Sequence, residues 1–215
     1  MSGDKIPTWI VVPSGGRPCL HDCLAAVRGQ SDGVALVVNG GYTGPDSGPV
    51  TVVKDEGPDR NISRWWNIGL DAVARRCDHQ GISRWNVVVL NDDTVMAPGS
   101  VDTLVSGLRR HRSAQLAFCG PIGRLLTEPG PDRITGWCFA VRGEGGLRAD
   151  ESLKWWAGDN ALDWAARAAG GSVIVPGVDH THLYPNGYTV ADRQLNEQAG
   201  RDMELFVQKW GRPAW

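Results

Sequence analysis

The sequence predicts an α/β fold with a mainly parallel central sheet flanked by helices, and two observations support this prediction. Short runs rich in β-branched residues alternate with longer helical segments, and the clearest of these runs are residues 9–13, 34–38, 50–53 and 85–90. The last run is almost wholly apolar, which is typical of a strand covered on both faces. Strands that alternate with helices form parallel sheets with right-handed crossovers, so we expect a doubly wound sheet.

Length and composition set limits on the class of protein. The 215 residues fit a single domain, 1–215, and 41% of them are hydrophobic, which is enough for a proper core. With 22 basic and 24 acidic residues the formal net charge is −2, which gives no broad positive surface for nucleic acid or an anionic membrane. We find no apolar run of membrane-spanning length and no secretory leader, so we expect a soluble, cytoplasmic protein. The five cysteines lack the paired spacing of a zinc site, and we expect free thiols.

Each helix expected in the first half of the chain, about residues 8–112, has a local start signal. Pro18 suits the first turn of a helix that follows the first strand. Asn61 can cap a long helix, and Pro98 with Gly99 opens another. The expected helices therefore begin at residue 18 and span 63–80 and 98–112.

The second half, about residues 113–215, is less regular. The pattern changes after residues 114–119, and the segment 120–133 looks loop-rich. A strand at 134–142 and helices at 159–169 and 198–210 are expected after it. We interpret this half as an elaboration of the first half.

Two adjacent carboxylates, Asp92 and Asp93, follow the strand at 85–90. Burying one carboxylate is costly, and two side by side repel unless a positive charge joins them. Open α/β sheets bind ligands just beyond the carboxyl ends of their strands. A hard divalent cation that brings its own phosphate ligands would resolve the repulsion there. The alternative is a solvated turn in which Asp92 or Asp93 caps the next helix.

Four polar segments follow the expected strands in an order that is informative together. They are Pro13-Ser14 with Arg17, Asn39, Asn67 near the head of the long helix, and Asn91-Asp92-Asp93-Thr94. This order resembles the nucleotide-sugar half of a glycosyltransferase of the GT-A fold, a Rossmann-like fold, and is most similar to family 2. The resemblance implies transfer of a sugar, with inversion, from a nucleotide-diphosphate sugar to an acceptor hydroxyl. The residues it implies for contact with the nucleotide-sugar are Pro13, Ser14, Arg17, Asn39, Asn67, Asn91 and Asp92. For Asn67 the alternative is helix packing.

The resemblance extends to about residue 186 and implies a metal ion and a base. Asp93, with Asp92 through water, would hold Mn²⁺ or Mg²⁺ as a Lewis acid, and His182, with His180 as second choice, would complete the site. For either histidine the alternative is a surface loop residue. The helix from Asp159 is similar to the one that carries the family's catalytic base, so Asp159 is the implied general base. Its alternative role is a helix N-cap.

Three positions depart from the family pattern. Asn39 stands where an Asp usually contacts the base or ribose, Gly158 replaces a Glu, and Ala161 replaces an Asp. The identity of the nucleotide therefore stays open. Because two acidic residues of the family motif are absent, a non-catalytic module that binds a sugar nucleotide is an alternative. The Ser14–Arg17 loop resembles, without its further Gly and Lys, the Gly-rich loop of a sugar-nucleotide nucleotidyltransferase, which is another alternative.

Tryptophans mark the expected acceptor side. Trp137, Trp155 and Trp156 are candidates for an acceptor platform, because sugar faces and nucleobases both stack on indole. The alternative is core packing between sheet and helix. For Trp65 and Trp66 we prefer core packing. The acceptor stays open among a small molecule, a protein and a modified nucleobase in DNA, the last because residues 182–186 resemble some phage and actinobacterial glycosyltransferases.

Overall fold

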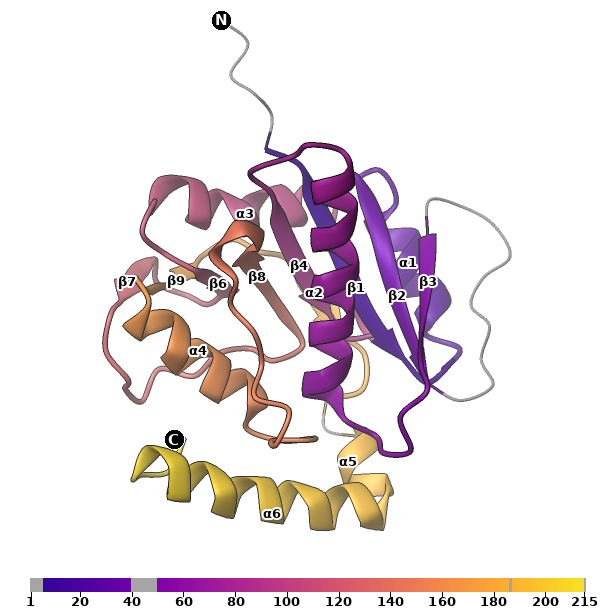
Figure 1. Ribbon diagram of the computed structural model, residues 1–215, viewed down its shortest axis with the longest axis vertical. Helices are drawn as coiled ribbons and strands as arrows, with labels where there is room; N and C mark the ends of the chain where they lie inside the picture. The colour runs from indigo at the N-terminus through magenta and orange to yellow at the C-terminus, as the bar shows by residue number, and fades with distance from the viewer. Residues whose placement is uncertain (1–5, 40–49, 186, 215) are drawn as a thin grey trace, which may run out of the picture.

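The computed structural model describes residues 6–39, 50–185 and 187–214. Its centre is an eight-stranded sheet in the order β3-β2-β1-β4-β8-β6-β9-β7 (Figure 1). The strands of this sheet are β1 (Thr8–Ser14), β2 (Gly33–Asn39), β3 (Val50–Asp55), β4 (Asn86–Leu90), β6 (Leu116–Cys119), β7 (Arg124–Leu126), β8 (Cys138–Arg142) and β9 (Ser172–Val175). A second sheet pairs β5 (Thr94–Met96) with β10 (His180–His182).

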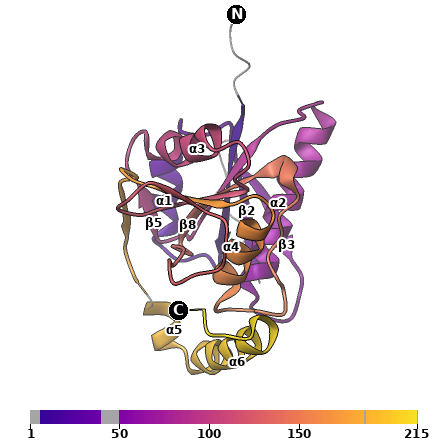
Figure 2. The same ribbon diagram turned by 90° about the vertical axis from the view of Figure 1, so that its left-hand side faces the viewer.

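Helices cover both faces of the large sheet (Figures 1 and 2). The helices on the two faces are α1 (Leu20–Val27), α2 (Ile62–His79), α3 (Ser100–Arg110) and α4 (Gly158–Ala168). The chain also forms α5 (Gly187–Ala191), α6 (Arg193–Trp210) and a short 3-10 helix at Gly143–Gly145. Side chains alternate along β1, so Ile10 and Val12 pack with α1 and α3 while Trp9 and Val11 pack with α2 and α4. The protein is therefore a three-layer α/β structure, as the sequence predicts.

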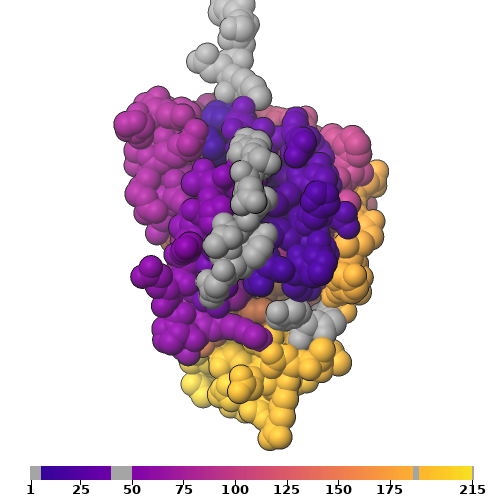
Figure 3. Space-filling view, turned by 90° about the vertical axis from the view of Figure 1, so that its right-hand side faces the viewer, coloured from indigo at the N-terminus to yellow at the C-terminus, as the bar shows by residue number. Residues whose placement is uncertain are grey.

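The first four strands set the direction of the sheet. β1 lies parallel to β2 and β4, and β2 lies parallel to β3, so their carboxyl ends share one edge. Figure 1 places α5 and α6 beyond that edge. In Figure 3 the yellow C-terminal residues close this end of the molecule, below the indigo and purple residues that lead up to α2. β8 is antiparallel to β4 and β6, and the connection from β6 to β8 needs no crossover helix.

The helix starts follow the predicted signals with small shifts: α1 begins at Leu20 rather than residue 18, and α3 at Ser100 rather than residue 98. The side chain of Asn61 caps α2 by accepting a hydrogen bond from Arg64 N at 2.9 Å, as predicted. α3 follows Gly99, which lies in the left-handed region, so neither Asp92 nor Asp93 caps it. α6 begins at Arg193 rather than at residue 198, because Asp192 caps it through the N–H groups of the first turn.

Short strands account for the remaining differences. The segment 120–133, expected to be loop-rich, contains β7, an edge strand of 3 residues, too short for an apolar pattern to be recognised. The strand expected at 134–142 begins only at Cys138, because a turn holds Thr135 and Cys138 together: Cys138 N donates to Thr135 O, and Thr135 Oγ1 donates to Cys138 O.

All five cysteines are free and buried, as expected. Within the part of the chain that the structure describes, no helix combines the length and apolarity that crossing a membrane requires. The predictions that concern residues 1–5 and Asn186 lie outside the described residues.

Candidate functional site

A cavity of about 290 Å³ opens at the carboxyl ends of β1, β2 and β4. Its walls also include the start of α2, the segment before β8 and the segment before α4. Of the residues singled out from the sequence, those that line it are Pro13, Ser14, Arg17, Asn39, Asn91, Asp92, Asp93, Trp137, Trp155, Trp156, Asp159 and His182. Residues from both halves of the chain thus form one site.

Asn67 is the exception. Its side chain is buried between α2 and the segment before α4, where Nδ2 donates to Ala149 O and to Glu151 Oε1 and Oδ1 accepts from Ala149 N. It does not line the cavity. The amide of Asn67 joins two segments of the chain, which corrects its assignment to the nucleotide.

The two adjacent carboxylates lie in the turn between β4 and β5 and are almost fully buried, with exposures of 4% for Asp92 and 3% for Asp93. Asp92 accepts a hydrogen bond from Ser14 Oγ at 2.7 Å and forms an ion pair with Arg17. The same Arg17 nitrogen lies 3.1 Å from Asp93 Oδ2. One guanidinium therefore bridges both carboxylates. Burial opposes ionisation of Asp93, but nearby His182 and Arg17 outweigh it and lower its pKa.

His182 reaches the acid pair through the small sheet. β10 lies antiparallel to β5 with His182 opposite Thr94, which places its Nε2 3.3 Å from Asp93 Oδ1. The ring of Trp137 stacks on His182 with centroids 4.8 Å apart. His180 is engaged elsewhere, because its Nε2 accepts a hydrogen bond from Trp137 Nε1 at 2.9 Å. Of the two histidines, His182 is the one that faces Asp93.

The donor atoms at this point fit a divalent cation with outside ligands. Asp93 Oδ1 is buried and accepts no hydrogen bond, although His182 Nε2 lies next to it. Within the described residues no group of three or more His, Cys, Asp or Glu side chains could hold an ion. If a divalent ion binds here, Asp93 and His182 are the side chains that would hold it, with phosphate oxygens and water as further ligands.

Asp159 lies in the first turn of α4 and faces the same cavity. The N-cap of α4 is Ala157, with φ of 58°, so Asp159 is not the helix cap. A Cβ on Gly136 would clash with Asp159 Oδ2, so the glycine leaves room for the carboxylate. Burial raises the pKa of Asp159 to about 6, although Asn160 N–H and Arg133 favour its ionised form. A carboxyl group with this pKa can act as a base near neutral pH.

If the site is catalytic, this pKa predicts how its activity depends on pH. If Asp159 accepts the proton of a nucleophile, only its ionised form is active, and this form is lost as the pH falls through about 6. We expect the rate to fall about tenfold for each pH unit below this value and to level off above it. A pH–rate profile of the wild type checks this. The residual activity of Asp159→Asn should lack the inflection, and an unchanged inflection would assign it to another group.

The packing around α4 explains the two departures near Asp159. A Cβ on Gly158 would clash with Ser63 Oγ, which donates a hydrogen bond to Leu153 O, so α2 and α4 approach too closely for a Glu at 158. Ala161 is buried in a cluster with Leu153 and Trp164, where an unpaired carboxylate would be costly. The packing of α4 therefore explains why neither position 158 nor position 161 holds an acidic residue.

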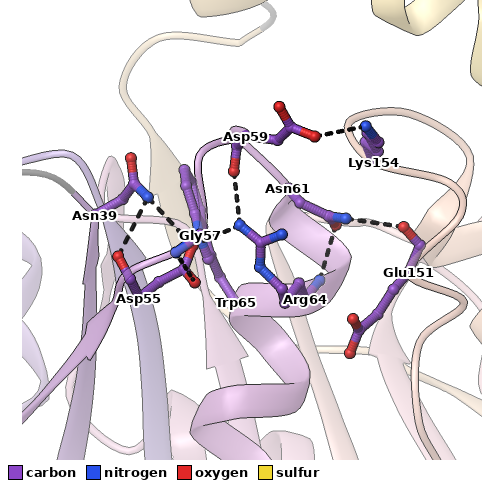
Figure 4. A network of polar contacts seen from close by, with 9 residues as sticks. All are labelled: Asn39, Asp55, Gly57, Asp59, Asn61, Arg64, Trp65, Glu151 and Lys154. Atoms are coloured by element: carbon purple, nitrogen blue, oxygen red, sulfur yellow. Dashed lines mark hydrogen bonds and ion pairs between the residues drawn. The ribbon is translucent and has the colours of Figure 1, made fainter.

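Asn39 is held by a carboxylate that the sequence analysis did not single out (Figure 4). Its Nδ2 donates to Asp55 Oδ2 at 3.1 Å, and Trp65 Nε1 and Arg64 Nη2 donate to the same oxygen at 2.6 and 2.7 Å. Burial raises the pKa of Asp55, but Arg64 and Trp65 outweigh this effect and lower it. An Asp at 39 would face a second carboxylate, so the neutral amide suits this site. The acidic end of β3 was the available signal.

No protein-family model matches the chain, and no curated protein matches it. Among solved structures it is similar to the 2-C-methyl-D-erythritol 4-phosphate cytidylyltransferase from Thermus thermophilus, with a TM-score of 0.45 and 15% sequence identity. The similarity covers 89% of this chain and 96% of that chain.

The tryptophan wall of the cavity is fixed by the C-terminal helices. Asp202 of α6 is 1% exposed, and its Oδ2 accepts hydrogen bonds from Trp155 N at 2.6 Å and Trp156 N at 2.8 Å. Trp155 Nε1 donates to Thr189 Oγ1 of α5 at 2.9 Å. Asp202 was not found from the sequence, because an acidic residue on an amphipathic helix looks like part of its solvated face. Trp65 and Trp66 also reach the cavity, although both are buried as expected.

If the cavity binds a nucleotide donor and an acceptor, Trp155→Ala or Trp156→Ala should weaken use of the acceptor more than binding of the nucleotide. The loss should be about 1–3 kcal/mol if a base stacks there. The acceptor KM, measured beside the nucleotide Kd, checks this. Trp85→Ala is the control, because Trp85 is buried but does not line the cavity. An equal loss of nucleotide binding, or unfolding, would make the two indoles part of the core.

Proposed function

We propose that the protein is a metal-dependent, inverting glycosyltransferase that moves a sugar from a nucleotide-diphosphate donor to an acceptor hydroxyl. The observation that carries the proposal is Asp159, a cavity carboxyl whose pKa is raised to about 6. A hydroxyl nucleophile must lose its proton as it attacks, and a positioned base with this pKa accepts it.

The strand-end residues account for the donor in this proposal. A Mn²⁺ or Mg²⁺ ion on Asp93 and His182 would stabilise the negative charge of the leaving nucleoside diphosphate. Arg17 offers a guanidinium fork to the same phosphates. Ser14 holds Asp92 in place, and Asn39 lies at the end of β2, on the side of the cavity that we assign to the nucleoside.

The charge distribution supports a single displacement. Three carboxylates of the described residues line the cavity, and Asp92 and Asp93 are both engaged by Arg17. Asp159 is the carboxylate left for the acceptor. A base that assists direct attack on the anomeric carbon gives inversion of configuration.

The alternative is a nucleotidyltransferase that makes a sugar nucleotide. The glycine-containing loop after β1, where Gly16 N donates to Ser14 Oγ at 2.9 Å, suits a phosphate ligand and favours this reading. Two observations count against it. Its nucleophile is a phosphate that is already ionised and needs no base, and among the described residues no lysine lines the cavity.

The two activities release different products. We would incubate the protein with a panel of nucleotide-diphosphate sugars, with and without Mn²⁺, and measure free nucleoside diphosphate. A parallel set with nucleoside triphosphates and sugar 1-phosphates would measure pyrophosphate. Manganese-dependent release of nucleoside diphosphate supports the proposal, and release of pyrophosphate supports the alternative.

A melting-temperature screen of the same ligands detects binding without turnover. A ligand at 100 times its Kd stabilises the fold by about 2.7 kcal/mol, which is easily measured. Stabilisation without any product would indicate a non-catalytic binding module.

A further inference from the structure

Arg17 occupies the place where the acid pair would meet a cation. One of its nitrogens contacts Asp92 Oδ1 and lies 3.1 Å from Asp93 Oδ2. Ser14 Oγ donates to the second oxygen of Asp92, and His182 lies beside the second oxygen of Asp93. Each of the four carboxylate oxygens therefore already has a polar neighbour from this chain.

The charges of Asp92, Asp93 and Arg17 do not balance. Two buried carboxylates carry two negative charges, and Arg17 supplies one positive charge, held there by Asp92 and Asp93, which raise its pKa despite the opposing effect of burial. A divalent ion on Asp93 would add two positive charges beside the guanidinium, and like charges repel strongly in a partly buried site. The ion and Arg17 therefore compete for the same carboxylates.

A diphosphate changes this competition. Guanidinium binds phosphate through two parallel hydrogen bonds, and phosphate oxygens are also good ligands for Mg²⁺ and Mn²⁺. The Arg17 side chain is 22% exposed and lines the cavity, so its head can reach a ligand there. A bound diphosphate would offer Arg17 a new anionic partner and add negative charge between it and the ion.

We propose that Arg17 makes the binding of metal and diphosphate interdependent. In the ligand-free protein it neutralises Asp92 and Asp93 and weakens metal binding. When a diphosphate enters, the guanidinium turns to the phosphates and the carboxylates become free for the cation. This inference rests on the proposed function, because it takes the acid pair as the metal site.

Thermodynamic coupling of this kind is reciprocal. If diphosphate strengthens metal binding by some factor, metal strengthens diphosphate binding by the same factor. We expect a factor of about 10 or more, within the usual range for coupled sites. Neither ligand alone should bind tightly.

Equilibrium dialysis with Mn²⁺, with and without inorganic pyrophosphate, tests the coupling without any enzyme activity. The free Mn²⁺ concentration is calculated from the protein-free chamber, after correction for manganese held by pyrophosphate in solution. In the wild type, pyrophosphate should lower the apparent Kd for Mn²⁺ by about tenfold or more. In Arg17→Ala, Mn²⁺ alone should bind about tenfold more tightly than in the wild type, and pyrophosphate should add little.

Arg60→Ala is the matched control for loss of one positive charge. Arg60 also lines the cavity, but it pairs with Asp192 at 2.6 Å and does not contact the acid pair. The affinity of Arg60→Ala for Mn²⁺ alone should stay close to the wild-type value. A gain as large as that of Arg17→Ala would reduce the effect to general electrostatics and overturn the coupling.

The stability of the variants gives a second readout. Arg17→Ala leaves two buried carboxylates without their counter-ion, so it should melt below the wild type, and Mn²⁺ should raise its melting temperature more than that of the wild type. Arg17→Lys keeps the positive charge but loses the planar guanidinium, so its melting temperature should lie between those of Arg17→Ala and the wild type. If Arg17→Ala stays unfolded at every Mn²⁺ concentration, the guanidinium is structural and the coupling is wrong.

Failure of the inference and failure of the proposed function give different results. Tight Mn²⁺ binding to the wild type that pyrophosphate does not change would overturn the coupling and leave the metal site in place. Absence of Mn²⁺ binding in both the wild type and Arg17→Ala, with and without pyrophosphate, would remove the metal site itself.

Discussion

Asp159→Asn is expected to lower sugar transfer by about 10²–10⁴-fold while nucleotide binding stays near the wild-type level, because a positioned base has about this effect on rate. The substitution keeps the size of the side chain, and an Asn oxygen can still accept the hydrogen bond from Asn160 N. Ala157 is the N-cap of α4, so the helix does not depend on the carboxylate. Release of nucleoside diphosphate, measured beside the melting temperature and the nucleotide Kd, separates loss of catalysis from loss of structure.

Gly136→Ala is a companion variant that keeps Asp159 itself. The added methyl group would clash with Asp159 Oδ2 and move the carboxylate. Transfer should fall while the donor still binds.

An Asp159→Asn enzyme that transfers sugar at close to the normal rate would show that Asp159 is not the base. The other acids of this region are engaged outside the cavity: Asp163 with Arg167, Asp150 with Lys209, and Glu151 with Asn67.

Asp93→Asn is expected to abolish the part of donor binding that depends on Mn²⁺. Loss of a residue that only orients a ligand costs about 10–100-fold in metal affinity, so loss of a direct ligand should cost at least as much. The fold should persist, because Asp92 keeps its partners Ser14 and Arg17. The measurement is the Kd for a nucleoside diphosphate with and without Mn²⁺.

The two histidines of β10 provide the control for this experiment. His182→Gln should reproduce part of the loss, because His182 Nε2 lies 3.3 Å from Asp93 Oδ1. His180→Gln should leave the Mn²⁺-dependent part of nucleotide binding unchanged, because His180 is hydrogen-bonded to Trp137 and does not face Asp93. An Asp93→Asn protein that keeps its manganese-enhanced affinity would show that Asp93 is not the ligand.

Local signals account for what the sequence analysis predicted well. β1 to β4 are short apolar runs with clear turns between them, and Asp92 and Asp93 follow one of them directly, so both the sheet and its acidic edge were readable. Asp159 was singled out because its helix resembles a family pattern, and the structure places it in the first turn of α4, facing the cavity. Each of these features depends on neighbours in sequence, which a single chain displays.

Long-range pairing accounts for what local patterns do not show. His182 was named beside Asp93 only through the family resemblance, because their contact depends on β5 and β10, two strands of three residues each, too short for any apolar pattern. Asp202 meets Trp155 only after α6 has packed across the end of the molecule. Asn67 was misplaced because its position near the head of α2 does not reveal which face of the helix meets the segment at Ala149.

The β5–β10 pair has a kinetic consequence for the proposed metal site. It consists of three residue pairs, and one more hydrogen bond, from Leu183 N to Asp93 O at 2.9 Å, ties its end to the acid pair. Short, peripheral pairings of this kind open at a lower free-energy cost than the core of a sheet. Because one ligand lies on each side of the pairing, opening it separates Asp93 from His182. The residence time of a bound ion would then depend on how long the β5–β10 pair stays closed, and not only on the intrinsic affinity of the ion. The release of the nucleoside diphosphate product would depend on the same opening.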